Sequence, residues 1–165
     1  MSKPPRYWTK AKKILSKKDR VMARLILNYK DGTMQIMCRS KQSTISQSWS
    51  NDRGKTWTPM KESNLPNPNA GTDAVTLSNG TQLIVYNHTN RSGRFPSGRN
   101  MLNIAISEDG KDWKPVMTLE KSKGEYSYPA VIQTNDSKIH ITYTYRRISI
   151  KHVVIDPSKL GKKGK

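Results

Sequence analysis

Short apolar and β-branched runs alternate with tight turns from residue 21 onward, and helical periodicity is almost absent. The clearest unit is RLILNYKDGTMQIMCRS, residues 24–40, in which Asp31-Gly32 separates two such runs. An Asp-Gly pair tolerates the positive φ angles that a tight hairpin turn requires. The pattern therefore predicts an antiparallel β-hairpin over these residues.

The hairpin pattern recurs twice further along the chain. It returns as DAVTLSNGTQLIVYNH around Asn79-Gly80, and more weakly as PAVIQTNDSKIHITYTYRR around Asp136-Ser137. The three hairpins start near residues 23, 72 and 127. A spacing of about 50 residues indicates a repeated unit of one small sheet.

Each of the first two hairpins is followed by a third strand, an acidic turn and a fourth short strand. The turns are SNDRGKTW, residues 50–57, and SEDGKDW, residues 107–113, whereas the third unit has only a third strand, residues 148–155. Repeated four-stranded units are typical of propeller blades, and a β-sandwich would not explain why the turn recurs at the same place. We predict an all-β fold, a partial β-propeller of about three four-stranded antiparallel blades. The blades are expected near residues 21–62, 71–120 and 126–156.

The acidic turn resembles the Asp box of the sialidase superfamily. Ser50 and Asp52 can accept bonds from backbone N–H groups of their own turn, Gly54 supplies an unusual backbone conformation, and Trp57 packs where the next strand begins. SEDGKDW is one residue shorter and is interpreted as a degenerate copy. In the family these boxes lie away from the active site, so we expect both turns to be structural.

A wider resemblance, over about residues 21–160, is to sialidase-like proteins with BNR repeats. Members of this family are six-bladed propellers, and the matched stretch is similar to their carboxy-terminal half. The matching segments are LPNPNAGTDAV, LIVYNHT, GEYSYPAVIQT, HITYTYRR and IKHVVIDP. The resemblance implies half of a six-bladed propeller and the chemistry of a glycoside hydrolase acting on a terminal acidic sugar.

In such hydrolases a tyrosine activated by a glutamate replaces the usual carboxylate nucleophile, because a neutral phenol is not repelled by the acidic sugar. GEYSYP supplies Glu125, Tyr126 and Tyr128, and we expect the two tyrosines to share one face of an extended segment. The pattern does not decide which tyrosine faces the channel, and one of them could instead pack between blades. Asp73 is the candidate for proton transfer, with a turn or strand-cap role as the alternative.

Arginines hold a carboxylate in bidentate fashion, so they are the candidate substrate-binding residues. Arg39 ends the second strand of the first blade, and Arg146 and Arg147 end the matching strand of the third. The alternative is that these arginines are solvated strand ends. The loop 90–100 carries further arginines and could be a flap over the site or a mobile loop without a site role.

The net charge of +18 is concentrated in the tails, because residues 1–20 hold eight basic residues against Asp19 and residues 159–165 add four lysines. We expect residues 1–20 and 159–165 to be basic tails around a propeller at 21–158, with the first tail disordered and polyanion contact non-specific. No cofactor or metal is expected, since Cys38 is the lone cysteine and the histidines lack ligand spacing. No apolar stretch follows the first charges, so we expect a cytoplasmic protein without membrane contact.

The sequence is compatible with two functions. The first is a sialidase-like glycoside hydrolase or a fragment of one, and the alternative is a non-catalytic carbohydrate- or polyanion-binding module or an inactive truncated relative. Three blades leave two faces uncovered, so we also expect a homodimer or a partner chain that supplies the missing blades.

Overall fold

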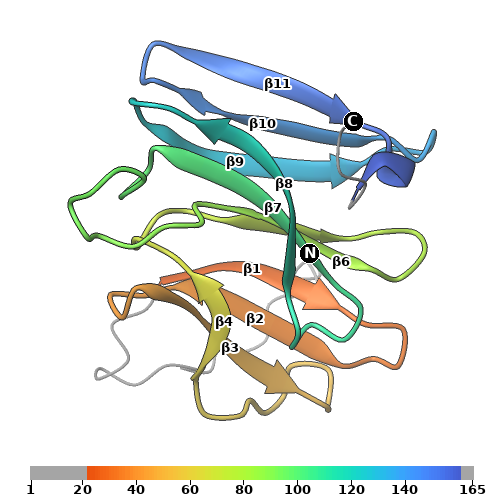
Figure 1. Cartoon of the computed structure of the whole chain (residues 1–165). Coiled ribbons are helices and arrows are strands. Elements are labelled where there is room, and N and C mark those ends of the chain that lie inside the picture. Colours follow the sequence, from red (N-terminus) through yellow and green to blue (C-terminus); the bar gives the residue numbers. More distant parts are fainter. Residues whose placement is uncertain (1–21, 161–165) are drawn as a thin grey trace, which may run out of the picture.

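The computed structural model describes residues 22–160, which form three antiparallel sheets stacked side by side (Figure 1). The first sheet contains β1 (Met22–Asn28), β2 (Met34–Arg39), β3 (Thr44–Ser50) and β4 (Lys61–Pro66). The second contains β5 (Asp73–Thr76), β6 (Gln82–Tyr86), β7 (Met101–Ser107) and β8 (Lys114–Lys121). The third contains β9 (Tyr126–Gln133), β10 (Ile139–Tyr145) and β11 (Ser149–Ile155), and a short 3-10 helix, η1 (Pro157–Lys159), follows it.

Each sheet is a meander, because its strands pair in chain order. The first strands of successive sheets, β1, β5 and β9, lie next to one another, as the innermost strands of propeller blades do. The predicted fold is confirmed: two four-stranded blades and one three-stranded blade occupy the expected parts of the chain. The expected tail at residues 1–20 and the last five residues lie outside the described part. Within residues 22–160, no helix has the length and apolar character needed to cross a lipid bilayer.

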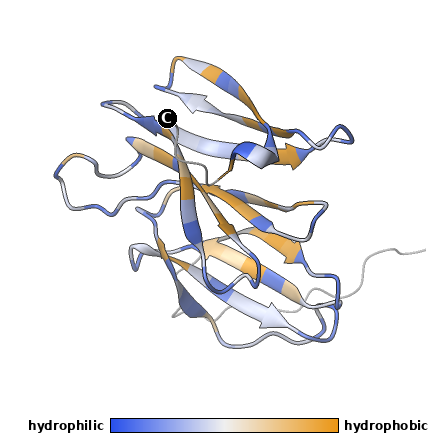
Figure 2. Cartoon of the chain, turned by 45° about the vertical axis from the view of Figure 1, so that its right-hand side comes forward, coloured by the Kyte–Doolittle hydropathy of each residue, from blue (hydrophilic) through white to orange (hydrophobic). Residues whose placement is uncertain are grey.

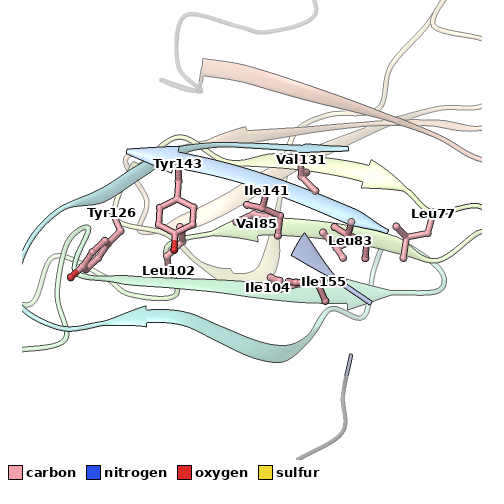
Figure 3. Close-up of a cluster of buried hydrophobic side chains, with 11 residues drawn as sticks. Leu77, Leu83, Val85, Leu102, Ile104, Tyr126, Val131, Ile141, Tyr143 and Ile155 are labelled. Atoms are coloured by element: carbon pink, nitrogen blue, oxygen red, sulfur yellow. The ribbon is translucent and has the colours of Figure 1, made fainter. Parts of the chain in front are cut away.

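The hydrophobic core lies between the sheets, in two clusters on either side of the second one. All five residues of β6 are buried, since this strand has another sheet against each face. One cluster, around Leu83, Leu102 and Ile141, joins the second and third sheets (Figure 3). The other, around Leu27, Ile84 and Trp113, joins the first and second sheets. Figure 2 shows the apolar residues concentrated on the strands that face these junctions.

Antiparallel order sends successive connections to opposite ends of the sheets. We call one the box end, since it carries both acidic turns, and the other the loop end, since it carries the longest connection, drawn in green at the left of Figure 1. The box end consists of residues 29–33, 51–60, 77–81, 108–113 and 134–138. The loop end consists of residues 40–43, 67–72, 87–100, 122–125 and 146–148.

The third sheet leaves apolar side chains uncovered. Ile132, Ile150 and Val154 are 58%, 77% and 50% exposed, and β11 is an edge strand because no fourth strand follows it in the described residues. A propeller blade normally buries this face against the next blade. In the described residues, no further blade covers this face of the third sheet.

Candidate functional site

All seven candidate residues lie at the loop end or in the strand residues that adjoin it. Because strand direction alternates, the end of β2, the start of β5, the start of β9 and the end of β10 all meet there. The residues are Arg39, Asp73, Glu125, Tyr126, Tyr128, Arg146 and Arg147. The Asp boxes lie at the opposite end, as the sequence predicts.

A bulge in β9 separates the two candidate tyrosines. Tyr128 has a φ of 51°, a left-handed conformation that is strained for a residue with a Cβ, and the pairing of β9 with β10 shifts beside it. Tyr126 is fully buried in the core shown in Figure 3, whereas Tyr128 is 51% exposed. The expectation of a shared face is therefore wrong, because the bulge breaks the alternation of side chains.

Tyr128 lies against Arg99 and the backbone of Gly71. The Arg99 guanidinium carbon is 5.2 Å from the centroid of the Tyr128 ring. A Cβ on Gly71 would approach that ring to 3.3 Å, so glycine allows the close contact. A hydrogen bond from Arg99 and then the charges of Arg99 and Arg39 lower the pKa of the Tyr128 hydroxyl. Tyr128 is thus an exposed phenol with a stabilised anion.

Glu125 joins two arginines from different connections. Its Oε1 accepts hydrogen bonds from Arg99 Nη1 and Ser127 Oγ, each at 2.9 Å, and its Oε2 lies 2.9 Å from Arg147 Nε. Burial raises the pKa of Glu125, but these hydrogen bonds and charges outweigh burial and hold it below the ordinary value. Both carboxylate oxygens are engaged, so Glu125 fixes the positions of Arg99 and Arg147.

Asp73 connects the second and third sheets. Its Oδ2 accepts a hydrogen bond of 2.8 Å from the backbone N–H of Val131 in β9. Burial raises the pKa of Asp73, while backbone hydrogen bonds oppose that shift. A carboxyl group of this kind stays protonated to higher pH than an exposed one, which suits a proton donor.

The remaining arginines differ in what they contact. Arg146 is exposed and lies beside two aromatic side chains, with its Nε 3.4 Å from the Tyr126 hydroxyl and its guanidinium carbon 5.4 Å from the Tyr145 ring centroid. Arg147, by contrast, contacts Glu125. Arg39 is half-buried and its charge acts on Tyr128. The structure therefore brings Arg39, Arg147, Glu125 and Tyr128 together.

Arg99 is central to this site, although its loop was predicted only to be a flap or a mobile loop without a site role. It contacts both Glu125 and Tyr128, and its carbonyl accepts from the N–H of Tyr126 at 2.7 Å. Its loop is anchored, since Arg91 Nε donates to the Pro68 carbonyl at 2.9 Å. The sequence did carry one signal for this role. Arg99 comes just before β7, and the sheet holds a residue next to a strand in place.

The Asp boxes perform the structural role predicted for them. Asp52 accepts from the Thr56 N–H at 2.8 Å and the Thr56 hydroxyl at 2.6 Å, and Ser50 Oγ accepts from the Gly54 N–H. In the shorter copy Asp109 accepts from two backbone N–H groups of its own turn. Both carboxylates close their turns and lie far along the strands from Tyr128.

Comparison with known proteins agrees with this architecture. Residues 3–141 match the model of the BNR repeat-like domain family. The chain belongs to this family. The curated proteins give no match.

Solved structures with the same fold include sialidases. The intramolecular trans-sialidase from Ruminococcus gnavus is 18% identical with a TM-score of 0.70, over 90% of this chain and 35% of that one. The NanB sialidase from Streptococcus pneumoniae is 15% identical with a TM-score of 0.67, over 89% of this chain and 25% of that one. An α-L-arabinofuranosidase from Fusarium graminearum is 18% identical, over 84% and 45%, with a TM-score of 0.57. The likeness shows a sialidase-like fold, and this BNR-family chain spans about a third or a quarter of the two sialidases.

Proposed function

We propose that the loop end binds an acidic sugar and that, within a complete propeller, it hydrolyses the glycosidic bond of that terminal sugar. The observation that carries this proposal is Tyr128, an exposed phenol of lowered pKa held beside Arg99. A phenol of this kind is a suitable nucleophile where the substrate is an anion.

The charge of the loop end supports an anionic ligand. Its five connections contain a single carboxylate, Glu125, against seven basic residues. The basic residues are Lys41, Arg91, Arg94, Arg99, Lys123, Arg146 and Arg147. Arg99 and Arg147 are already oriented by Glu125, so their remaining N–H groups can bind the sugar carboxylate with little loss of side-chain entropy.

The proposed reaction uses a covalent intermediate. Tyr128 Oη attacks the anomeric carbon and passes its proton to Glu125, while the bond to the leaving oxygen breaks and Asp73 protonates that oxygen. Water then attacks the same carbon and gives a proton to Asp73. The Tyr128 oxygen leaves and regains its proton from Glu125, so both carboxyl groups return to their starting states.

Fluorogenic sialosides and uronides test this proposal. We expect Tyr128→Phe to lower turnover by at least about 100-fold, because the nucleophile is removed. Tyr126→Phe is the matched control, since that ring is buried and its hydroxyl is 2.5 Å from Ser122 Oγ. Equal turnover in the wild type and Tyr128→Phe would contradict a catalytic Tyr128.

A non-catalytic binder of acidic sugars is the second candidate. It is favoured by Glu125, because both of its oxygens are engaged by arginines and neither is left as a free base. A binding titration with 3′-sialyllactose separates the two functions. Saturable binding without turnover, in the presence of any partner that completes the ring, indicates the binder.

The uncovered third sheet supports the proposal that a homodimer or a partner chain supplies further blades. Exposed Ile132, Ile150 and Val154 lie on the face that a neighbouring blade would bury. Light scattering at micromolar concentration tests this, and a stable monomer of 18.8 kDa would contradict it.

A further inference from the structure

A groove of about 710 Å³ lies at the box end, between the first and second sheets. Its lining includes Tyr29, Trp49, Asp31, Lys61 and Asp109. A second groove of about 550 Å³ adjoins it and shares Tyr29 and Asp31. Both are formed by blades that the described chain contains in full, so this surface needs no further blade to be complete.

The floor of the larger groove is fixed by contacts between the two sheets. Gly110, in the second Asp box, packs so closely that a Cβ would lie 1.8 Å from Tyr29 Oη and 2.8 Å from Trp49 Cη2. Gln35 Nε2 donates to the Gly110 carbonyl at 2.8 Å, and Tyr29 Oη donates to Gln35 Oε1 at 2.6 Å. The aromatic rings are thereby held in place before any ligand arrives.

Two aromatic rings form the apolar part of the groove. The centroids of Tyr29 and Trp49 are 5.3 Å apart, and Lys111 Nζ lies 5.8 Å from the Trp49 centroid. Trp49 is partly exposed, and its indole N–H donates to no group within residues 22–160. A partly exposed aromatic ring with a polar edge suits a ligand that presents an apolar face and hydroxyl groups together.

Polar atoms with spare hydrogen-bonding capacity surround these rings. Asp31 Oδ1 accepts from the Thr33 N–H at 2.9 Å and its carboxylate also bonds the Thr33 side chain, so about two of its roughly four acceptor positions are used. Asp109 uses Oδ1 for its own turn in the same way. In the described part of the chain, Lys61 forms no ion pair. The groove thus offers both acceptors and donors to a ligand.

The charge of the lining selects the class of ligand. Asp31 and Asp109 balance Lys61 and Lys111, so the larger groove has no net charge, and its carboxylates disfavour anions. We propose that this groove binds a neutral oligosaccharide, with a sugar ring stacked on Trp49 and its hydroxyls bonded to Asp31 and Lys61. The proposal is independent of the function assigned to the loop end.

Binding of neutral tetrasaccharides tests this site. The probes are cellotetraose, maltotetraose and xylotetraose, and the readout is the NMR signal of the Trp49 indole N–H, assigned with Trp49→Phe. We expect at least one neutral probe to shift this signal saturably, with a dissociation constant on the order of 1 mM, as few contacts and a shallow groove permit.

Variants that keep the fold locate the binding. Asp31→Asn still accepts from the Thr33 N–H, so the turn is preserved, yet we expect it and Lys61→Ala each to weaken binding at least about threefold. Tyr128→Phe, at the opposite end, should leave neutral-sugar binding unchanged. The site is overturned if no neutral probe shifts the Trp49 signal, or if Asp31→Asn and Lys61→Ala both bind as tightly as the wild type.

Discussion

The two ends of the propeller fragment differ in how they use charge. The loop end has seven basic residues and one carboxylate in its connections, whereas the box end has five basic residues and six carboxylates. The box-end carboxylates are Asp31, Asp52, Glu108, Asp109, Asp112 and Asp136, and its basic residues are Lys30, Arg53, Lys55, Lys111 and Lys138. One fold therefore presents a cationic surface and a nearly neutral one.

The partners of these charges explain the difference. At the box end Asp52 and Asp109 accept from backbone N–H groups within a few residues, so their charges stabilise their own turns. At the loop end Glu125 binds Arg99 and Arg147, which come from two other connections. Local pairing makes a rigid turn, while pairing between connections places cationic groups beside one another where a ligand can reach them.

The largest expected effect concerns the box end. Trp113 is 2% exposed, packs between the first two sheets and donates to the Gly110 carbonyl at 2.9 Å. We expect Trp113→Ala to lower the free energy of unfolding by about 3–5 kcal/mol, because it leaves a large cavity.

The first box supplies the matched control for that change. Trp57 occupies the same position and makes the same bond to Gly54 but is only partly buried, so Trp57→Ala should cost distinctly less. Urea denaturation of both variants measures this. Equal losses would show that the two boxes stabilise the fold alike.

The turns and their residues could be predicted from the sequence because their chemistry is local. Asp31-Gly32 and Asn79-Gly80 form the expected hairpins, with positive φ at Gly32 and Gly80. The structural interpretation of Asp52 is also confirmed, since every partner of its carboxylate lies within its own turn. Local hydrogen bonds leave a pattern that one sequence is enough to show.

The arrangement of the loop end could not be predicted in the same way. Tyr126 and Tyr128 are two residues apart, so alternation places them on one face, but the bulge at Tyr128 inverts that result. Arg99 reaches Glu125 across 26 positions in the chain. Contacts of that kind depend on how the sheets stack, which no spacing in the sequence specifies.

The next largest effect tests the loop end. Arg99→Met keeps most of the side-chain volume but removes the charge beside Tyr128 and Glu125. We expect it to weaken binding of 3′-sialyllactose about tenfold, as the loss of a charge-assisted bond predicts. Lys111→Met is the control at the box end and should leave this affinity unchanged. Calorimetric titration measures both, and equal affinities would remove Arg99 from the proposed site.

A smaller effect concerns pH. The pKa of Glu125 is lowered in the folded state. The ionised carboxylate therefore stabilises the fold fully above the ordinary glutamate pKa near 4.5, and this stabilisation is lost as pH falls through the folded-state pKa. Glu125→Gln should therefore cost about 1 kcal/mol at pH 7 and less at pH 3.

The contribution of Asp73 to stability depends on pH with the opposite sign. Its pKa is raised, so its favourable contribution is present at low pH and is lost as pH rises through the folded pKa. Asp73→Asn can still accept from the Val131 N–H, so this variant should gain relative stability as pH rises. Urea denaturation between pH 3 and 7 measures the free energy of unfolding of both variants. Parallel pH profiles would contradict the opposite pKa shifts of Glu125 and Asp73.

The smallest effect separates the two ends by their response to salt. Binding of an anion to exposed arginines is screened as ionic strength rises, because the Debye length falls from roughly 10 Å at 0.1 M to about 3 Å at 1 M. We expect the affinity for 3′-sialyllactose to fall about threefold over that range, while the affinity of the box-end groove for a neutral sugar stays constant, since its lining has no net charge. Titration of the same sample with both ligands, each at two salt concentrations, makes the comparison internal. If both affinities fell equally, the neutral sugar would be binding among the loop-end arginines, and the division of the molecule into a cationic end and a neutral end would be wrong.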